Sequence, residues 1–350
     1  MSEIAPSLFV YLWLKFNSRS QQTGILITLQ KAHPLQYIAS FLLVAGTVIL
    51  IVPTFSNISF PLRWSVNYLE LYILALFVVG VVSFLFFRSN VLATVSLGCC
   101  FLLSFYLHHK TDGELLGTKT AEGPGSVVRV ATFNTNSIGE DVRGTLERII
   151  ATQPDILLVQ EIPPLYSTFI ESLLPEDMRY KMVRPSIGLD GMAIYSRFDL
   201  LGLEEQSIEG CPFISCRMKA RSDEDEFYLL TTHPQPVLKG VDSERLQRQL
   251  DSIQNYILQL DAPVLIGGDF NTVIWSNEMN SFRAPLELED SRWGFSPTLE
   301  GNLNLWQPLM DHLLFGPEFH RLNFHRIDYE GTDVGVFAEF QLINTDAPEN

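Results

Sequence analysis

An acid and an amide stand two positions apart in the run Val-Leu-Ile-Gly-Gly-Asp-Phe-Asn-Thr, residues 264–272. Short apolar runs bounded by glycine are typical of buried strands. Because side chains alternate along an extended chain, we expect Asp269 and Asn271 on one face and Phe270 on the other. A carboxylate beside a carboxamide at a strand end can hold a water, a hard cation or a phosphate oxygen. A polar turn that only caps the strand is the alternative interpretation.

The elements that must position this pair alternate between strands and helices. Apolar runs predict strands over residues 127–134, 156–160, 191–196, 213–217, 227–232, 264–268, 310–315, 322–327 and 334–342. Helical spacing predicts helices over residues 142–151, 164–174 and 243–260. Strands outnumber helices, and paired strands flank the helices. This order excludes a simple parallel, doubly wound sheet.

Polar residues end these strands one after another and form six short motifs. They are Thr132-Phe133-Asn134-Thr135-Asn136, Val159-Gln160-Glu161, Thr231-Thr232-His233-Pro234, Gly268-Asp269-Phe270-Asn271, Met310-Asp311-His312 and Gly331-Thr332-Asp333. In this order they resemble the endonuclease/exonuclease/phosphatase superfamily, which includes type-I deoxyribonucleases, abasic-site endonucleases, inositol-phosphate 5-phosphatases and neutral sphingomyelinases. The resemblance covers residues 127 to 342, and bacterial membrane-anchored members look similar in layout.

The resemblance implies an α/β fold in which two packed sheets are flanked by helices, a four-layered sandwich of the DNase I type with the site at one end. It also implies a metal site. Glu161 would be the principal metal carboxylate, helped by Asn134 or Asn136, and Asp333 would complete the set. Hard oxygen ligands suit Mg²⁺ or Mn²⁺. Taken alone, Glu161 fits a surface turn equally well.

The same resemblance implies four catalytic residues. Asp269 would orient or deprotonate the attacking water, while Asn271 and His233 would hold the phosphate oxygens as charge develops. Asp311 would orient the histidine with which the last motif of the family normally closes. Taken alone, His233 could simply satisfy a backbone carbonyl.

One position departs from the family pattern. The last motif normally reads Ser/Thr-Asp-His, and here it reads Thr332-Asp333-Val334. The isopropyl group of Val334 neither donates a hydrogen bond nor carries charge. Losing one such transition-state contact commonly lowers the rate by ~10²–10³-fold. A catalytically impaired member that serves as a ligand-binding or interaction module is therefore the rival hypothesis.

The apolar residues concentrate near the amino terminus. Residues 35–52 and 91–107 carry no charge, and residues 68–87 carry one acid, Glu70. At 1.5 Å per residue such helices match the hydrocarbon core of a bilayer, which is about 30 Å thick. They predict three transmembrane helices, the second and third joined by a tight hairpin at residues 88–90. Buried core helices of a soluble protein are the alternative.

The spans divide the chain into five parts. We predict a cytoplasmic lead over 1–34, the spans within 35–107, a linker over 108–126, the phosphoesterase-like domain over 127–343 and a tail over 344–350. Lys15, Arg19, Lys31 and Arg88 favour a cytoplasmic amino terminus in an inner, multi-pass membrane location, with the domain outside the cytoplasm. The lysine and two histidines just after the third span argue weakly the other way.

The charge balance bears on the substrate. The chain has 24 Lys and Arg against 40 Asp and Glu, a formal net charge of -16. So acidic a surface repels a phosphate backbone, which makes extended nucleic acid a poor partner. We therefore expect a small phosphate-ester substrate, and lipid as the partner of the spans. A third hypothesis, in which the spans themselves are the functional unit and the domain regulates them, has little support, because three helices whose only interior acid is Glu70 offer no obvious ion or substrate path.

Overall fold

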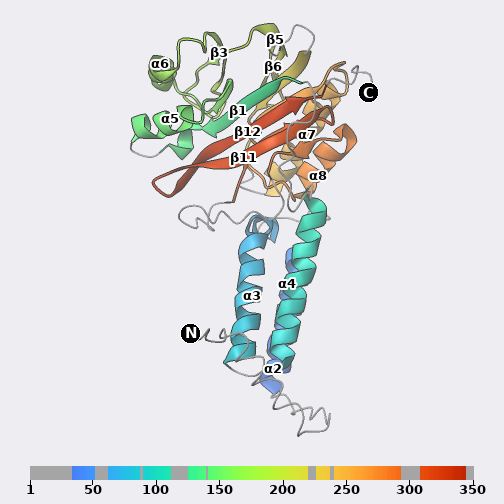
Figure 1. Ribbon diagram of the computed structural model, residues 1–350. Coiled ribbons are helices and arrows are strands. Elements are labelled where there is room, and N and C mark those ends of the chain that lie inside the picture. Colours follow the sequence, from blue (N-terminus) through green and yellow to red (C-terminus); the bar gives the residue numbers. More distant parts are fainter. Residues whose placement is uncertain are drawn as a thin grey trace, which may run out of the picture.

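The computed structural model describes residues 34–51, 62–86, 90–111, 125–138, 141–219, 226–236, 240–292 and 308–343 (Figure 1). The predicted lead up to residue 33, the hairpin turn, most of the linker and the tail lie outside these residues. The described parts form a helical stalk and a two-sheet domain above it (Figure 1).

The stalk consists of three apolar helices. They are α2 (Pro34–Ile51), α3 (Leu69–Leu85), which follows the 3₁₀ turn η2 (Leu62–Tyr68), and α4 (Asn90–Lys110). All three are long and apolar enough to cross a membrane, with 18, 21 and 21 residues in the candidate spans. The predicted spans are therefore confirmed as helices, and α4 continues three residues beyond the predicted end of its span.

Twelve described strands form two six-stranded sheets. The first sheet runs in the order β11 (Phe319–Tyr329), β12 (Thr332–Leu342), β1 (Val127–Asn134), β2 (Ile156–Gln160), β4 (Met192–Ser196) and β3 (Tyr180–Arg184). The second runs in the order β5 (Leu200–Ile208), β6 (Cys211–Lys219), β7 (Glu226–Thr232), β8 (Val264–Asp269), β10 (Asp311–Phe315) and β9 (Glu289–Asp290). Each sheet has one parallel pair near its middle, β1 with β2 and β7 with β8.

The sheets pack face to face, and helices cover both outer faces. Alternate apolar side chains of both sheets form the inner core, which includes Leu158 of β2, Leu265 of β8 and Phe340 of β12. Helices α5 (Val142–Ile150) and α6 (Pro164–Leu173) cover the first sheet, and α7 (Gly240–Ile257) and α8 (Asn277–Arg283) cover the second. The predicted four-layered α/β sandwich is confirmed.

Glycines allow the close packing behind the end of β8. A Cβ atom on Gly267 would lie 2.3 Å from the Leu158 side chain of the facing sheet. Gly268 has a φ of +156°, and a Cβ atom there would lie 2.0 Å from the carbonyl oxygen of Thr232. Gly268 therefore requires glycine, whereas a larger residue at Gly267 would force the Leu158 side chain to move. The strand does not stop at the glycines as predicted but runs on to Asp269.

The elements that sequence reasoning missed lie at edges or are short. β3 and β5 are the edge strands of their sheets, and most of their side chains reach solvent. Such strands lack the apolar run that marks a buried strand. Helix α8 has only seven residues, too few for a helical period to stand out.

Candidate functional site

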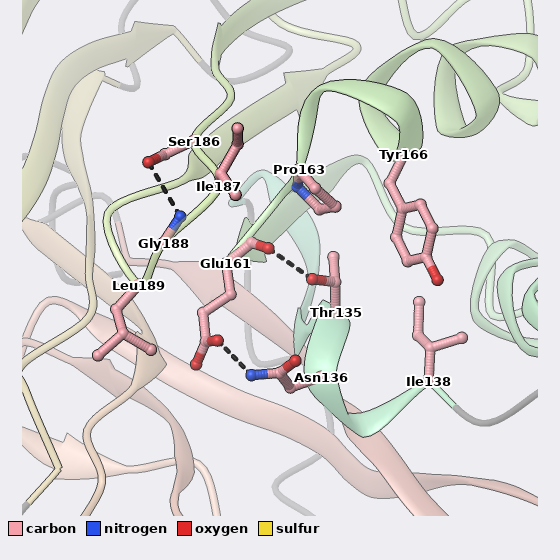
Figure 2. Close-up of a pocket in the computed structure, with 10 residues that line it drawn as sticks. All are labelled: Thr135, Asn136, Ile138, Glu161, Pro163, Tyr166, Ser186, Ile187, Gly188 and Leu189. Atoms are coloured by element: carbon pink, nitrogen blue, oxygen red, sulfur yellow. Dashed lines mark hydrogen bonds between the residues drawn. The ribbon is translucent and has the colours of Figure 1, made fainter.

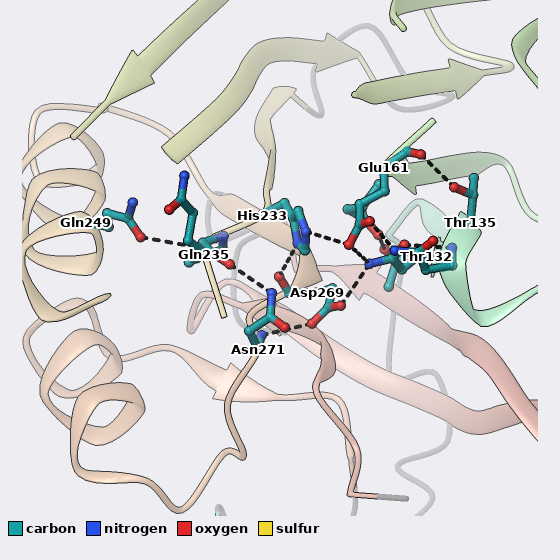
Figure 3. A network of polar contacts seen from close by, with 12 residues as sticks. Thr132, Thr135, Glu161, His233, Gln235, Gln249, Asp269 and Asn271 are labelled. Atoms are coloured by element: carbon teal, nitrogen blue, oxygen red, sulfur yellow. Dashed lines mark hydrogen bonds and ion pairs between the residues drawn. The ribbon is translucent and has the colours of Figure 1, made fainter. Parts of the chain in front are cut away.

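Four strand ends meet at one rim of the sandwich. Asn134 ends β1, Glu161 follows β2, His233 follows β7 and Asp269 ends β8. Since β1–β2 and β7–β8 are the two parallel pairs, their carboxyl ends lie at the same edge of each sheet. Figure 3 shows Glu161, His233 and Asp269 converging from these ends. One ligand atom from each of these three residues lies within 4.8 Å of the others.

Glu161 occupies a left-handed turn directly after its strand. Its φ is +55°, which costs a non-glycine residue roughly 1–3 kcal/mol. The Thr135 hydroxyl donates to the Glu161 carbonyl at 2.6 Å and so helps to hold this turn. The side-chain amides of Asn134 and Asn136 both donate to the Glu161 carboxylate. The carboxylate is thus fixed at the rim by donors from the end of β1 and from the turn that follows it.

Asn134 joins two carboxylates from different sheets. Its Nδ2 donates to Glu161 Oε1 at 2.7 Å and to Asp269 Oδ2 at 3.0 Å. Its Oδ1 accepts the backbone N–H of Asn136 at 2.9 Å. Because the amide oxygen is engaged there, Asn134 meets the carboxylates as a donor. In this arrangement it positions the two acids, and the ligand role inferred from the resemblance stays a prediction, as it does for Asn136.

Asn271 is not on an extended strand, and the expected alternation with Asp269 is wrong. Its φ is +52°, a left-handed conformation that asparagine tolerates better than most residues. Its backbone N–H donates to Asp269 Oδ1 at 2.8 Å, and its Nδ2 donates to the carbonyl of Pro234 at 2.9 Å. The short turn therefore wraps around the Asp269 carboxylate instead of continuing the pleat.

His233 is almost completely buried and has acceptors at both ring nitrogens. Nε2 lies 3.0 Å from Glu161 Oε1, and Nδ1 lies 3.0 Å from the Asp269 carbonyl oxygen. Since a carboxylate and a carbonyl only accept, both contacts are hydrogen bonds when the ring carries both protons. Burial acts to lower the pKa of His233, but Glu161 and Asp269 outweigh it and raise that pKa.

The pKa of Glu161 changes in the matching direction. Burial acts to raise the pKa of this carboxyl, whereas hydrogen bonds from His233 and Asn134, with the charge of His233, bring it below its ordinary value. Glu161 and His233 therefore each favour the charged form of the other, with side chains 11% and 1% exposed.

Asp311 faces Asp269 directly across the antiparallel pair β8–β10. Like charges in this position are destabilising. Among the described residues, Asp311 Oδ1 is buried and has no hydrogen-bond partner. Burial first, and then the charge of Asp269, hold the pKa of Asp311 well above its usual range. Asp311 thus lies beside Asp269, and its orphaned oxygen marks a place for a proton or a cation.

Asp333 lies at the start of β12 and is paired with a cation. Arg326 of β11 donates to Asp333 Oδ2 at 2.6 Å, and both side chains are largely buried. Asp333 is outside the three-residue cluster of Glu161, His233 and Asp269. The charge of Asp333 raises the pKa of Asp311, and the charge of Arg326 lowers it.

Val334 faces away from the rim. It is 1% exposed and packs with Phe133 and Ile327 in the apolar layer under α5 and α6. The register of β11 against β12 shifts between Ile327 and Asp328, opposite this position. Arg326, which the sequence motifs did not indicate, contributes the cation beside Asp333 instead.

A polar link between the sheets was also missed. The side chain of Gln160 is fully buried, accepts from the Thr132 hydroxyl at 3.2 Å and donates to the Thr231 hydroxyl at 3.1 Å. Thr231 belongs to the other sheet, so Gln160 ties the two sheets together directly behind the site. An amide at the end of an otherwise apolar strand was the available signal.

The residues at the rim fit a divalent cation. Glu161 and Asp269 present carboxylate oxygens, and the unpartnered oxygen of Asp311 lies next to Asp269. Hard oxygen donors of this kind suit Mg²⁺ or Mn²⁺. The ring of His233 already has acceptors at both nitrogens, which makes the carboxylates the better ligands.

Comparisons with known proteins agree with this geometry. The sequence model of the Endonuclease/Exonuclease/phosphatase family matches residues 131–333, ending one residue before Val334. The search of curated proteins found no match.

Solved structures share the fold. An endonuclease/exonuclease/phosphatase from Beutenbergia cavernae is 17% identical with a TM-score of 0.51, covering 64% of this chain and 73% of that one. A family protein from Bacteroides thetaiotaomicron is 17% identical with a TM-score of 0.51, over 63% of this chain and 100% of that one. The family joins nucleases and phosphatases, enzymes that hydrolyse phosphate esters. With the family model spanning more than half of its residues, the chain belongs to the endonuclease/exonuclease/phosphatase family.

Proposed function

We propose that this protein is a membrane-anchored phosphoesterase that depends on Mg²⁺ or Mn²⁺ and hydrolyses a small phosphodiester, a phospholipid or a nucleotide. The observation that carries the proposal is the convergence of Glu161, His233 and Asp269 within 4.8 Å at the strand ends of a family member. The three apolar helices supply the anchor. The family resemblance extends to bacterial members with such spans.

The carboxylate of Asp269 is held in a position to act on a water molecule. The backbone N–H of Asn271 holds Oδ1, and the amide of Asn134 holds Oδ2. Asp269 would orient the attacking water and accept its proton. When bound by Glu161 and its acidic neighbours, the divalent cation supplies positive charge that neutralises the phosphate and polarises the phosphoryl group.

Two further side chains would act on the phosphoryl oxygens. A His233 ring that carries both protons would act through its positive charge, because its contacts with Glu161 and with the Asp269 carbonyl occupy both N–H groups. Charge that develops on a phosphoryl oxygen is stabilised strongly by a preorganised donor in such a site. Asn271 uses one amide hydrogen on Pro234 and has a second for the substrate.

Turnover by the purified protein tests the proposal. In lipid nanodiscs with Mg²⁺ or Mn²⁺, the full chain is expected to hydrolyse bis-p-nitrophenyl phosphate, a phospholipid or a nucleotide, and a chelator should abolish the activity. Asp269→Ala should lower the rate by about 10²–10⁴-fold. Asp261→Ala, which removes an exposed acid from the loop before β8, is the matched control and should be unchanged. Absence of turnover on these esters and on DNA would overturn the proposal.

The position of Val334 favours a second candidate, a family member that binds a cation or phosphate without turnover. No imidazole follows Asp333, and Val334 itself is buried away from the rim. This candidate predicts that Mg²⁺ or inorganic phosphate raises the melting temperature of the protein while every ester stays intact. Metal-dependent turnover that Asp269→Ala removes excludes it.

A further inference from the structure

A cavity of about 460 Å³ adjoins the candidate metal site (Figure 2). Asn136 and Glu161, which form one wall of it, also belong to the site. Figure 2 shows Glu161 between the segment that holds Thr135 and Asn136 and the turn that holds Ser186 to Leu189. The volume is within the range of small-molecule sites, roughly 300–1,000 Å³. A group bound here would lie next to a phosphate held at Glu161.

The charge of the lining limits what the cavity can hold. Ten described residues line it; none is Lys, Arg or His, and Glu161 is the one carboxylate. A second phosphate or a carboxylate on the substrate would lose its hydration here without meeting a cation. The cavity therefore disfavours polyphosphates, bisphosphates and a continuing nucleic-acid backbone.

The apolar side chains of the lining show what it can hold. Half of the ten described lining residues are apolar or aromatic, namely Ile138, Pro163, Tyr166, Ile187 and Leu189. Ile187 and Leu189 lie on the turn that follows the strand β3, beside the site. Their side chains are 95% and 37% exposed. When a ligand covers water-exposed apolar side chains of this kind, the burial of their surface stabilises the complex.

We infer that this cavity binds an uncharged apolar or aromatic group that is esterified to the scissile phosphate. The inference rests on the proposed phosphoesterase function and narrows its substrate class. Ile187 and Leu189 would cover one face of the group, and Tyr166 and Ile138 lie across the cavity from them (Figure 2). An aromatic ring and a short acyl or alkyl chain share this chemistry.

Two substitutions with a matched control test the cavity. Ile187→Ser and Leu189→Ser should each raise KM for p-nitrophenyl and hexyl esters of phosphate by about tenfold, with kcat within about twofold of wild type. Ile187→Leu should retain the wild-type KM. Leu165→Ser is the control, because Leu165 is 78% exposed but does not line the cavity. Comparing variants on one substrate removes differences between leaving groups.

Non-hydrolysable phosphonates separate this inference from the proposed function. Calorimetry in nanodiscs with Mg²⁺ should show phenylphosphonate or hexylphosphonate binding at least tenfold more tightly than methylphosphonate, and Ile187→Ser should remove the difference. The phenyl and hexyl arms distinguish an aromatic from an aliphatic ligand. Binding of the phosphonates without turnover of any ester would overturn the proposed function and support the assignment of the cavity as a binding site. Turnover with Ile187→Ser and Leu189→Ser indistinguishable from Leu165→Ser would overturn the cavity assignment alone, and failure of both assays would overturn both.

Discussion

At the scale of single residues, the acidic rim is organised by shared hydrogen bonds. Asn134 spans Glu161 and Asp269, and His233 closes the triangle from the other side. Each of these contacts restrains a side chain that would otherwise be mobile at a strand end. Asp311 is the exception, because its buried Oδ1 meets no donor among the described residues. That orphaned oxygen is the clearest sign that the rim is built for a further positive group.

The raised pKa of Asp311 leads to a stability prediction. The pKa of Asp311 is higher in the folded state than in the unfolded state, so ionising this carboxyl costs more free energy in the folded protein. The free energy of unfolding therefore falls as the pH rises through the folded pKa. Asp311→Asn should therefore raise the melting temperature of metal-free protein at pH 8, equivalent to roughly 1–3 kcal/mol. The gain should vanish below about pH 4, where the carboxyl is protonated in both states.

Thermal unfolding at pH 8 and pH 4, with and without Mg²⁺, measures this effect. Bound Mg²⁺ should remove the advantage of the variant, because the cation then compensates the wild-type charge. Asp261→Asn, at an exposed loop, is the control and should leave the melting temperature unchanged. An Asp311→Asn protein that is less stable than wild type at pH 8 without metal would contradict the assignment.

At the scale of elements, the stalk and the domain share one interface. The Trp275 indole N–H donates to the Val66 carbonyl at 2.8 Å, and Arg292 forms an ion pair with Glu70 in the first turn of α3. Arg283 of α8 donates to the Lys110 carbonyl at the end of α4 at 3.3 Å. Figure 1 shows α8 directly above α4. The one acid in the predicted spans is thus a docking residue, which removes the basis for an ion path through Glu70.

The interface continues toward the site through polar contacts. The backbone N–H of Arg292 donates to Asp290 Oδ1 at 2.9 Å, and Asp290 Oδ2 lies 2.7 Å from His312 Nδ1. His312 Nε2 lies 2.9 Å from the carbonyl oxygen of Thr272, the residue after Asn271. Buried polar groups arranged in this way fix one geometry for the segments that they join. The turn around Asp269 is therefore held from the side of the stalk.

Replacing Glu70, the acid of its ion pair with Arg292, tests the interface between the stalk and the domain. The Arg292 side chain is 2% exposed, so Glu70→Ala leaves a buried guanidinium without its carboxylate and should lower stability by about 3 kcal/mol. The double variant Glu70→Ala, Arg292→Met should recover a large part of the loss, because no unpaired charge is left. Glu244→Ala, at an exposed acid, is the control.

Melting temperatures of wild type, Glu70→Ala, Arg292→Met, the double variant and the Glu244→Ala control in nanodiscs provide the measurement. A double-mutant cycle isolates the coupling between the two side chains. Additive effects, with no recovery in the double variant, would show that the pair does not hold the domain to the stalk.

At the scale of the whole molecule, charge and apolarity are separated. The formal net charge of -16 is concentrated after the spans, and the helices carry almost none of it. An acidic domain does not attract nucleic acid, whereas a phosphate ester with one apolar group carries far less negative charge to be repelled. The cavity, which Glu161 lines and which has no cation among its described lining residues, is consistent with that substrate class.

The distribution of cations predicts the side of the membrane. With Lys15, Arg19, Lys31 and Arg88 in the cytoplasm, a reporter joined after residue 112 should be active only outside the cytoplasm. A phosphatase reporter, which requires an oxidising compartment, should be active there, and a fluorescent protein that matures in the cytoplasm should stay dark. The same reporters joined after residue 33 should give the reverse. Reporter activities of the opposite sense would overturn the proposed orientation.

The sequence by itself determined the order of the elements and the ends of the strands that carry the candidate site residues. Hydrophobic periodicity is a local property, so β1 and β2 have the predicted bounds, and the three spans are helices. The motifs at the strand ends also placed Glu161, His233 and Asp269 correctly at one rim, because the carboxyl ends of parallel strands meet at one edge.

Only the tertiary structure decided how these residues face one another. The opposition of Asp311 and Asp269 and the pairing of Arg326 with Asp333 depend on how distant strands pair, and the left-handed turn of Asn271 is held by contacts with Asp269 and Pro234. The contact of Glu70 with Arg292 joins positions 222 residues apart. Such contacts form when whole layers pack together, and for that physical reason the sequence identified the reactive side chains while packing determined their partners.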